Sequence, residues 1–263
     1  MYKLGEPLDS LVLKIDRAKR HTRELESEHE KFLRDSAYRI DFRTDPNTRE
    51  RVHYLAEVKP VPKTFSVILG DALNNLRSCL DYAIYAMVQV GQPQALKPNE
   101  IAFPICSSPS DYQDRIKRLG KGLRPEAIKA IDEVASYTGG AGEYYCHLAQ
   151  LNNIDKHRLL LTICGYTGGH TMLPSQRQRV AEFHNKDVWE LRDAFMAKHV
   201  FLGEVGEILL SVPEAEVEEN MRFIINIAFA EPEICRGNPV IETLDEMARI
   251  ILKLDFDRRR LFR

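Results

Sequence analysis

The longest regular pattern of apolar positions in the chain runs from Thr64 to Gln89. Apolar side chains recur there at steps of three and four residues, which is the spacing of one helix face. They are Phe65, Ile68, Leu69, Ala72, Leu76, Leu80, Ala83, Ile84 and Met87. The pattern predicts a buried helix over 64–89, around which the rest of the chain is organised.

The other face of this predicted helix carries an unusual number of polar groups within three turns. These are Asp71, Asn74, Asn75, Arg77, Ser78, Asp81 and Tyr82. Arg77 and Asp81 are four residues apart, where oppositely charged side chains on a helix can pair. We therefore expect a polar cluster on this face.

Other segments show either the helical period or the two-residue alternation of strands. The predicted helices cover 8–33, 64–89, 143–158 and 240–254, and the predicted strands form a hairpin over 37–58 and lie near 159–164, 204–212 and 221–230. Long helices together with an antiparallel sheet, assembled from the hairpin and the later strands, predict the α+β class. We expect a single domain over 1–263, with a helical part at about 60–165 and C-terminal strands and a helix at about 200–257.

The helix predicted over 143–158 ends in the run Asp155-Lys156-His157-Arg158, directly before the apolar segment 159–164. A charged run between two apolar elements is unusual for a merely solvated stretch, which makes it a candidate site. An alternative remains open, because Lys, His and Arg at a helix C-terminus also interact favourably with the helix dipole.

Charge and cysteine content narrow the function classes. The 263 residues include 37 Lys and Arg and 39 Asp and Glu, so the net charge is −2. That balance argues against binding nucleic acid or anionic membrane by bulk attraction. The five cysteines lie far apart without a C-x-x-C pair, so neither a disulfide framework nor a zinc knuckle is indicated. No apolar run is long enough to span a bilayer, and no secretory segment is evident, so we expect a cytoplasmic protein without membrane association.

Several familiar chemistries lack their sequence signatures. Neither a G-x-S-x-G motif nor a dinucleotide-binding glycine pattern is present. A metal could in principle use His147, Asp155 and His157 with Asp71 or Asp81. Two histidines ten residues apart and a D-x-H pair form no recognised ligand pattern. We therefore expect no metal and no cofactor.

The remaining hypothesis is a composite polar site between the helices 64–89 and 143–158. In its catalytic form, His157 is the general base, Arg77 and Arg158 hold a phosphate, and Asp81 or Asp155 orients them. Asn74, Asn75 and Lys156 complete the expected binding residues. This set predicts a metal-independent enzyme that cleaves RNA or another phosphodiester.

In the structural form of the hypothesis, the same residues make a buried salt-bridge network in a binding protein that is not an enzyme. Arg77 would pair with Asp155, and Arg158 with Asp81. Breaking one partner of such a network costs about 3–5 kcal/mol. Both forms assume that Arg77 and His157 face one another across a helix contact. Solvent access discriminates between them, because a catalytic cluster must open into a cleft.

Two motifs carry a resemblance to known families. The pair G-D-x-L-x-N-L-R-S-x-L-D, at Gly70–Asp81, and L-x-x-L-x-N-x-D-K-H-R, at Leu148–Arg158, resembles a family of uncharacterised bacterial proteins. More distantly, an Arg on a helix beside a polar site is similar to the HEPN ribonucleases, all-helical domains with an Arg followed after four to six residues by His. Tyr82 stands where that histidine would be expected from Arg77.

Together these features predict a ligand- or RNA-binding module with HEPN-like character, and the ribonuclease or other phosphodiester-acting enzyme is the alternative. RNA or another phosphate-bearing ligand is the expected partner. A homodimer is compatible with the sequence.

Overall fold

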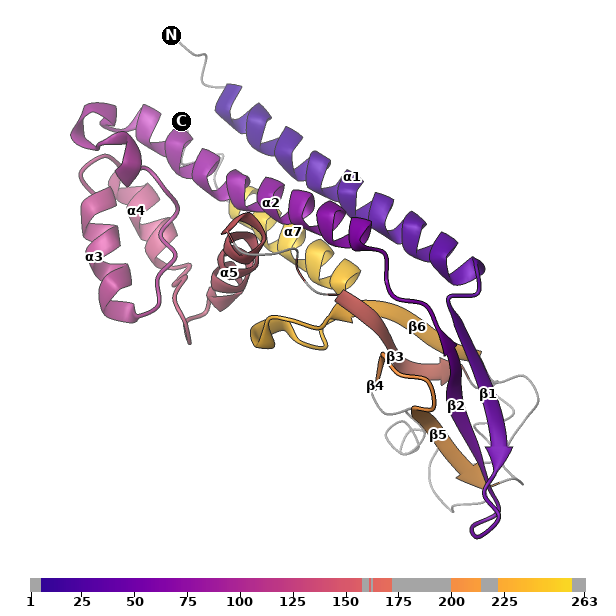
Figure 1. The fold of residues 1–263 in the computed structure, drawn as a ribbon. Coiled ribbons are helices and arrows are strands. Elements are labelled where there is room, and N and C mark those ends of the chain that lie inside the picture. The colour runs from indigo at the N-terminus through magenta and orange to yellow at the C-terminus, as the bar shows by residue number, and fades with distance from the viewer. Residues whose placement is uncertain (1–5, 158–160, 162, 172–199, 214–221, 257–263) are drawn as a thin grey trace. The chain divides into compact units, whose positions relative to one another are not determined.

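The computed structural model describes most of the chain (Figure 1). The described residues are 6–157, 161, 163–171, 200–213 and 222–256. The helices are α1 (Glu6–Arg34), α2 (Lys63–Val90), α3 (Pro109–Leu119), α4 (Pro125–Asp132), α5 (Glu143–His157) and α7 (Val240–Phe256). The strands are β1 (Tyr38–Thr44), β2 (Glu50–Val58), β3 (Ile163–Thr171), β4 (Val200–Leu202), β5 (Ile208–Pro213) and β6 (Arg222–Phe229).

Long helices and antiparallel sheets confirm the α+β class. The chain divides into two compact units: unit 1 comprises 1–26, 63–161 and 241–263, and unit 2 comprises 27–62 and 162–240. Compactness alone does not establish that a unit folds independently. The single domain over 1–263 therefore stays a prediction.

Helix α2 forms the centre of unit 1, as its apolar period predicts. Its buried side chains include Leu69, Leu73, Leu76 and Leu80, each at most 1% exposed. The helix starts after Pro60-Val61-Pro62, where proline removes backbone donors and stops the preceding strand. The predicted helix 64–89 is confirmed, with one further residue at each end.

The first part of α1 packs along α2, which explains the apolar seam predicted over 8–33. Lys14 Nζ donates to Asn75 Oδ1 at 3.1 Å, and the Cys79 thiol contacts the carbonyl oxygen of Leu11 at 3.7 Å. Leu11, Ile15 and Ala18 are buried on the same face. Asn75 therefore has a role in helix packing.

Unit 2 contains two three-stranded antiparallel sheets, ordered β1-β2-β5 and β4-β3-β6. The expectation of one sheet is thus wrong in its topology. The hairpin predicted over 37–58 is confirmed as β1 and β2, joined by the turn at Asp45. Side chains from both sheets share one core, at whose centre lie Leu55, Leu202 and Leu209.

Two predicted strands differ in extent from the observed ones. The strand expected at 159–164 overlaps β3 only at its start, and β3 continues to Thr171 through glycines that a sequence pattern assigns to a loop. Of the expected segment, 159, 160 and 162 lie outside the described residues. The strand expected at 204–212 begins only at Ile208, because Gly206 has a φ of +95° in the preceding turn.

Gly165 lies in β3, where glycine is required by a close approach within unit 2. A Cβ at this position would overlap the hydroxyl end of the Tyr38 ring. Burial raises the pKa of Tyr38 to about 12, with a smaller contribution from Cys164. The Tyr38 ring thus packs directly on the backbone of β3 at Gly165.

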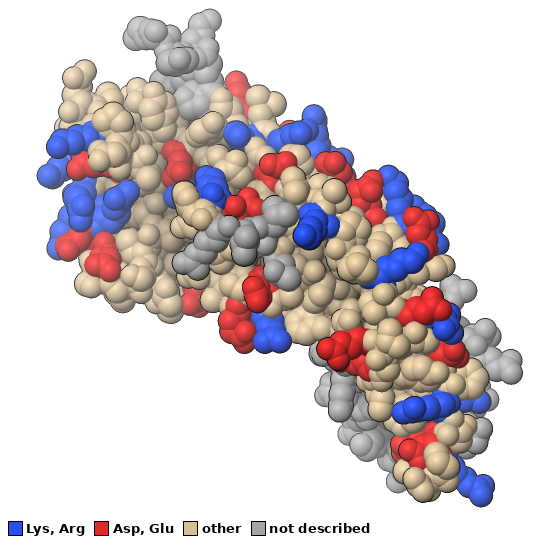
Figure 2. Space-filling model, in the orientation of Figure 1, with Lys and Arg blue, Asp and Glu red and all other residues tan. Residues whose placement is uncertain are grey.

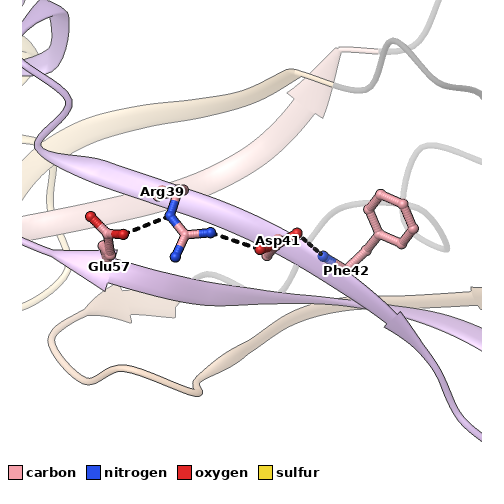
Figure 3. A network of polar contacts seen from close by, with 4 residues as sticks. All are labelled: Arg39, Asp41, Phe42 and Glu57. Atoms are coloured by element: carbon pink, nitrogen blue, oxygen red, sulfur yellow. Dashed lines mark hydrogen bonds and ion pairs between the residues drawn. The ribbon is translucent and has the colours of Figure 1, made fainter.

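The outer face of the β1-β2 hairpin carries a small polar network (Figure 3). Arg39 Nε donates to Glu57 Oε1 at 2.8 Å, and its Nη1 donates to Asp41 Oδ2 at 2.7 Å. Arg39 and Glu57 are register partners on the two strands. The three charged side chains are exposed, so water screens their charges and the ion pairs contribute little to stability. The network joins the two strands of the hairpin and is no candidate site.

Charges of both signs are interspersed over the visible face of the described residues (Figure 2). This distribution agrees with the near-zero net charge of the sequence. None of the helices in the described ranges combines the length and the apolar character that a bilayer crossing needs.

Candidate anion-binding site

A cavity of about 440 Å³ lies in unit 1, between α2, α3, α5 and the loop that follows α2. It is lined by Arg77, Ala102, Phe103, Ile105, Cys106, Ser107, Arg115, Thr138, Cys146, Ala149, Gln150 and Asn153. Two of these side chains are cationic and none is acidic. Ser107, Thr138, Gln150 and Asn153 are exposed, so the cavity opens to solvent.

The loop wall of the cavity is fixed by hydrogen bonds to a second segment. The Ser136 hydroxyl, fully buried, donates to the carbonyl oxygen of Pro104 at 2.5 Å. The backbone N–H of Cys106 donates to the Ser136 carbonyl at 3.1 Å, and that of Thr138 donates to the Cys106 carbonyl at 3.3 Å. The cavity is therefore preformed, because backbone bonds hold its wall in place.

Asp81 ties this wall to α2. Its Oδ1 accepts a hydrogen bond from the backbone N–H of Phe103 at 3.0 Å and lies 2.7 Å from Arg77 Nη1. The contact with Arg77 is an ion pair without hydrogen-bond geometry. The Arg77 side chain is only 18% exposed, whereas that of Asp81 is 39% exposed. Asp81 thus orients the Arg77 guanidinium group, which still lines the cavity.

Both cysteines of the cavity are neutral thiols near pH 7. Burial raises the pKa of Cys106 most, and Arg115 opposes that rise. Burial also raises the pKa of Cys146 most, and the negative charge of Glu143 adds to that rise. The Cys146 thiol contacts the Cys106 carbonyl oxygen at 3.7 Å. A thiolate is needed for nucleophilic reactivity, so these side chains serve as apolar lining.

The predicted residues Asn74 and Asn75 do not line this cavity. Asn75 is 8% exposed, accepts from Lys14 and donates from Nδ2 to the Asp71 carbonyl at 2.7 Å. The carbonyl oxygen of Asn74 accepts from the Ser78 hydroxyl at 2.7 Å. These contacts support helix packing and the α2 backbone.

Asp155 lies against a different part of α2 from Arg77. A Cβ on Gly70 would overlap the Asp155 carboxylate, so the two helices approach closely at this point. Gly70 and Arg77 are seven residues apart, which is about 10 Å along a helix axis. Burial raises the pKa of Asp155 most, followed by the charge of Asp71, while Lys156 opposes the shift. The predicted pair of Arg77 with Asp155 is replaced by Arg77 with Asp81.

We expect Asp155→Asn to raise the free energy of unfolding at pH 7. The raised pKa means that ionisation of Asp155 destabilises the folded state, and a negative charge in the last turn of α5 also opposes the helix dipole. The expected gain is about 0.3–1 kcal/mol, the range for a charge at a helix end.

This gain should depend on pH. Below the ordinary pKa of an Asp the carboxyl is protonated in both states, and the destabilisation develops as pH rises from there through the raised folded-state value. Urea unfolding at pH 3.5 and pH 7 measures the difference, with exposed Asp16→Asn as the control. An equal effect at both pH values would contradict the assignment.

The charged run at the end of α5 divides into a partly buried Asp155 and a solvated end. Lys156 and His157 are exposed, and neither lines the cavity. Arg158 lies outside the described residues. Lys156 and His157 occupy the last helical turn, where the Lys156 cation interacts favourably with the helix dipole. The structure therefore does not bring His157 to the Arg77 cavity.

Sequence reasoning found Arg77 and Asp81 but missed most of the cavity. Arg115 stands among other basic residues of α3, and no sequence signal separates it from them. Ser107 and Thr138 lie in turn-rich segments that read as ordinary loops. Gln150 and Asn153 follow the three-residue spacing of one helix face, which is the one signal that could have linked them to Cys146.

Within the described residues, no group of three or more His, Cys, Asp or Glu side chains is placed to hold a metal ion. The arrangement instead offers two guanidinium groups and several neutral hydrogen-bonding side chains around an open cavity. No family model, no curated protein and no solved structure matches the chain.

Proposed function

We propose that the protein is a binding module for a phosphate-bearing ligand, which it holds in the Arg77 cavity. The observation that carries the proposal is that Arg77 and Arg115 both line one open cavity and that no carboxylate is among the lining residues. Arginine presents several N–H donors in a planar fork that fits phosphate. A cavity of this size also lies within the usual range of about 300–1,000 Å³ for small-molecule sites.

The geometry favours binding over cleavage. General acid–base catalysis needs a titratable group within hydrogen-bond reach of the reacting atoms. The described lining contains no His, Asp or Glu, and its two thiols are neutral because their pKa values are raised. His157, the general base of the catalytic hypothesis, is exposed at the end of α5. The ribonuclease alternative therefore has less support than ligand binding.

All five cysteines are free thiols. Unpaired cysteines are typical of a reducing compartment, so the proposal places the protein in the cytoplasm.

Binding of inorganic phosphate and pyrophosphate, measured by isothermal titration calorimetry, tests the proposal. We expect Arg77→Gln and Arg115→Gln each to weaken binding by about 10–150-fold, because a hydrogen bond to a charged group contributes about 1.5–3 kcal/mol. Arg124→Gln is the matched control, because Arg124 is exposed and does not line the cavity. Equal binding by wild type and both cavity variants would disprove the assignment.

Substitution of Arg77 also removes the partner of Asp81, so stability must be separated from binding. Asp81→Asn keeps Arg77 and releases its guanidinium from the ion pair. We expect Asp81→Asn to retain phosphate binding even where its melting temperature falls. Loss of binding in Asp81→Asn and Arg77→Gln alike, with equal loss of stability, would show that folding alone was affected.

A cleavage assay distinguishes the two functions. We expect mixed RNA incubated with wild type, His157→Ala or Arg77→Ala in EDTA to remain intact in all three reactions, because the Arg77 cavity offers no described proton-transfer group. Gel electrophoresis of the RNA is the readout. Cleavage by wild type that both substitutions abolish would restore the ribonuclease alternative.

A further inference from the structure

The uncharged polar side chains of the Arg77 cavity narrow the class of ligand further than the arginines, which would bind any phosphate ester. Gln150 and Asn153 are three residues apart on α5, both exposed, and both line the cavity. Each amide offers two donors and an oxygen acceptor. Two adjacent amides suit a ligand edge that presents donors and acceptors side by side, as a nucleobase does.

The rest of the lining suits the body of such a ligand. Ala102 and Ala149 are small and leave room, and Phe103 and Ile105 add apolar surface. The Phe103 ring is fixed by a tilted contact with Tyr145, with ring centroids 5.4 Å apart. The Ser107 and Thr138 hydroxyls, which can donate and accept, suit the hydroxyls of a sugar.

Charge limits the number of phosphate groups. A phosphate monoester carries about −1.5 to −2 charges at pH 7, which Arg77 and Arg115 can balance in part, because Asp81 already pairs with Arg77. Each additional phosphate would add negative charge for which the described lining has no further cation. The volume of about 440 Å³ lies towards the low end of the range for small-molecule sites, which favours one monomeric ligand over a polymer.

We infer that the Arg77 cavity binds a nucleoside monophosphate, with its phosphate between Arg77 and Arg115 and its base at Gln150 and Asn153. This inference rests on the proposed function and specifies the ligand class. It separates the cavity into a phosphate end, common to all phosphate esters, and an amide end, which discriminates among them.

Calorimetry with the full chain tests the inference. The ligands are AMP, GMP, CMP and UMP, with ribose 5-phosphate, which lacks the base, adenosine, which lacks the phosphate, and inorganic phosphate. We expect at least one nucleotide to bind tenfold or more tightly than both ribose 5-phosphate and adenosine. Equal affinity for ribose 5-phosphate and all four nucleotides would overturn the assignment of a base site.

Variants at the amide end separate this inference from the proposed function. Gln150→Leu and Asn153→Leu should reduce nucleotide affinity towards that of ribose 5-phosphate and leave binding of inorganic phosphate unchanged. Gln89→Leu, an exposed amide on α2 outside the cavity, is the control and should change neither affinity. Unchanged nucleotide affinity in both cavity variants would refute the amide end while the phosphate site stands.

Two further outcomes are informative. If neither inorganic phosphate nor any phosphate ester binds, the proposed function fails and the inference fails with it. If a 5′-phosphorylated tetranucleotide binds more tightly than every monophosphate, the ligand is an RNA end and the monomer assignment is wrong.

Discussion

Gly165→Ala is expected to destabilise unit 2 by about 3 kcal/mol. The added methyl group would meet the hydroxyl end of the Tyr38 ring, which is rigid and partly buried. Gly165 is itself buried in β3, between β4 and β6, so the backbone has little freedom to move away. Forcing extra volume into a packed site typically costs about 1–3 kcal/mol, and a rigid aromatic neighbour places this substitution at the upper end.

Hydrogen exchange of β3 and β6 peptides, together with urea unfolding followed by circular dichroism, measures this effect. Gly203→Ala is the matched control, because a Cβ at Gly203 meets nothing within 4 Å. Tyr38→Leu introduced with Gly165→Ala should recover part of the lost stability, since the shorter side chain does not reach the added methyl. Additive effects of the two substitutions would contradict the contact, because residues in contact couple in a double-mutant cycle.

Leu76→Ala is expected to lower the free energy of unfolding of unit 1 by about 2–5 kcal/mol. Leu76 is fully buried on α2, and removing its side chain both loses apolar burial and leaves a cavity. Chemical unfolding measures the change. Val67→Ala on the same helix is the control, because Val67 is 49% exposed. A cost below 1 kcal/mol for Leu76→Ala would mean that α2 is not the centre of the core.

The elements that the sequence predicted well are those whose signal is local. The apolar period of 64–89 and the alternation of 37–58 depend on neighbouring residues, and both elements formed as expected. The ion pair of Arg77 and Asp81 was predictable for the same reason, because four residues separate partners on one helix.

The elements that the sequence did not predict depend on distant partners. β3 includes Gly165 because it pairs there with β4 and β6, and Tyr38, far away in sequence, occupies the space where a side chain at 165 would lie. The cavity wall depends on backbone hydrogen bonds that join Cys106 to Ser136 and Thr138, which no periodic pattern reveals. The run Asp155–Arg158 was conspicuous in sequence, yet Lys156 and His157 are solvated at a helix end, and Asp155 lies against Gly70 and does not line the cavity. A run of charged residues in the sequence therefore did not locate the cavity, which depends on the packing of segments far apart in the chain.

The interleaved segments of the two units affect how the chain can fold during synthesis. Unit 1 takes its residues from 1–26, 63–161 and 241–263, so its last helical segment leaves the ribosome only after most of unit 2 has been translated. Contacts between segments so far apart form slowly, because a long loop must close first. Until α7 is translated, unit 1 lacks its last helical segment, so its full set of contacts forms only late in synthesis.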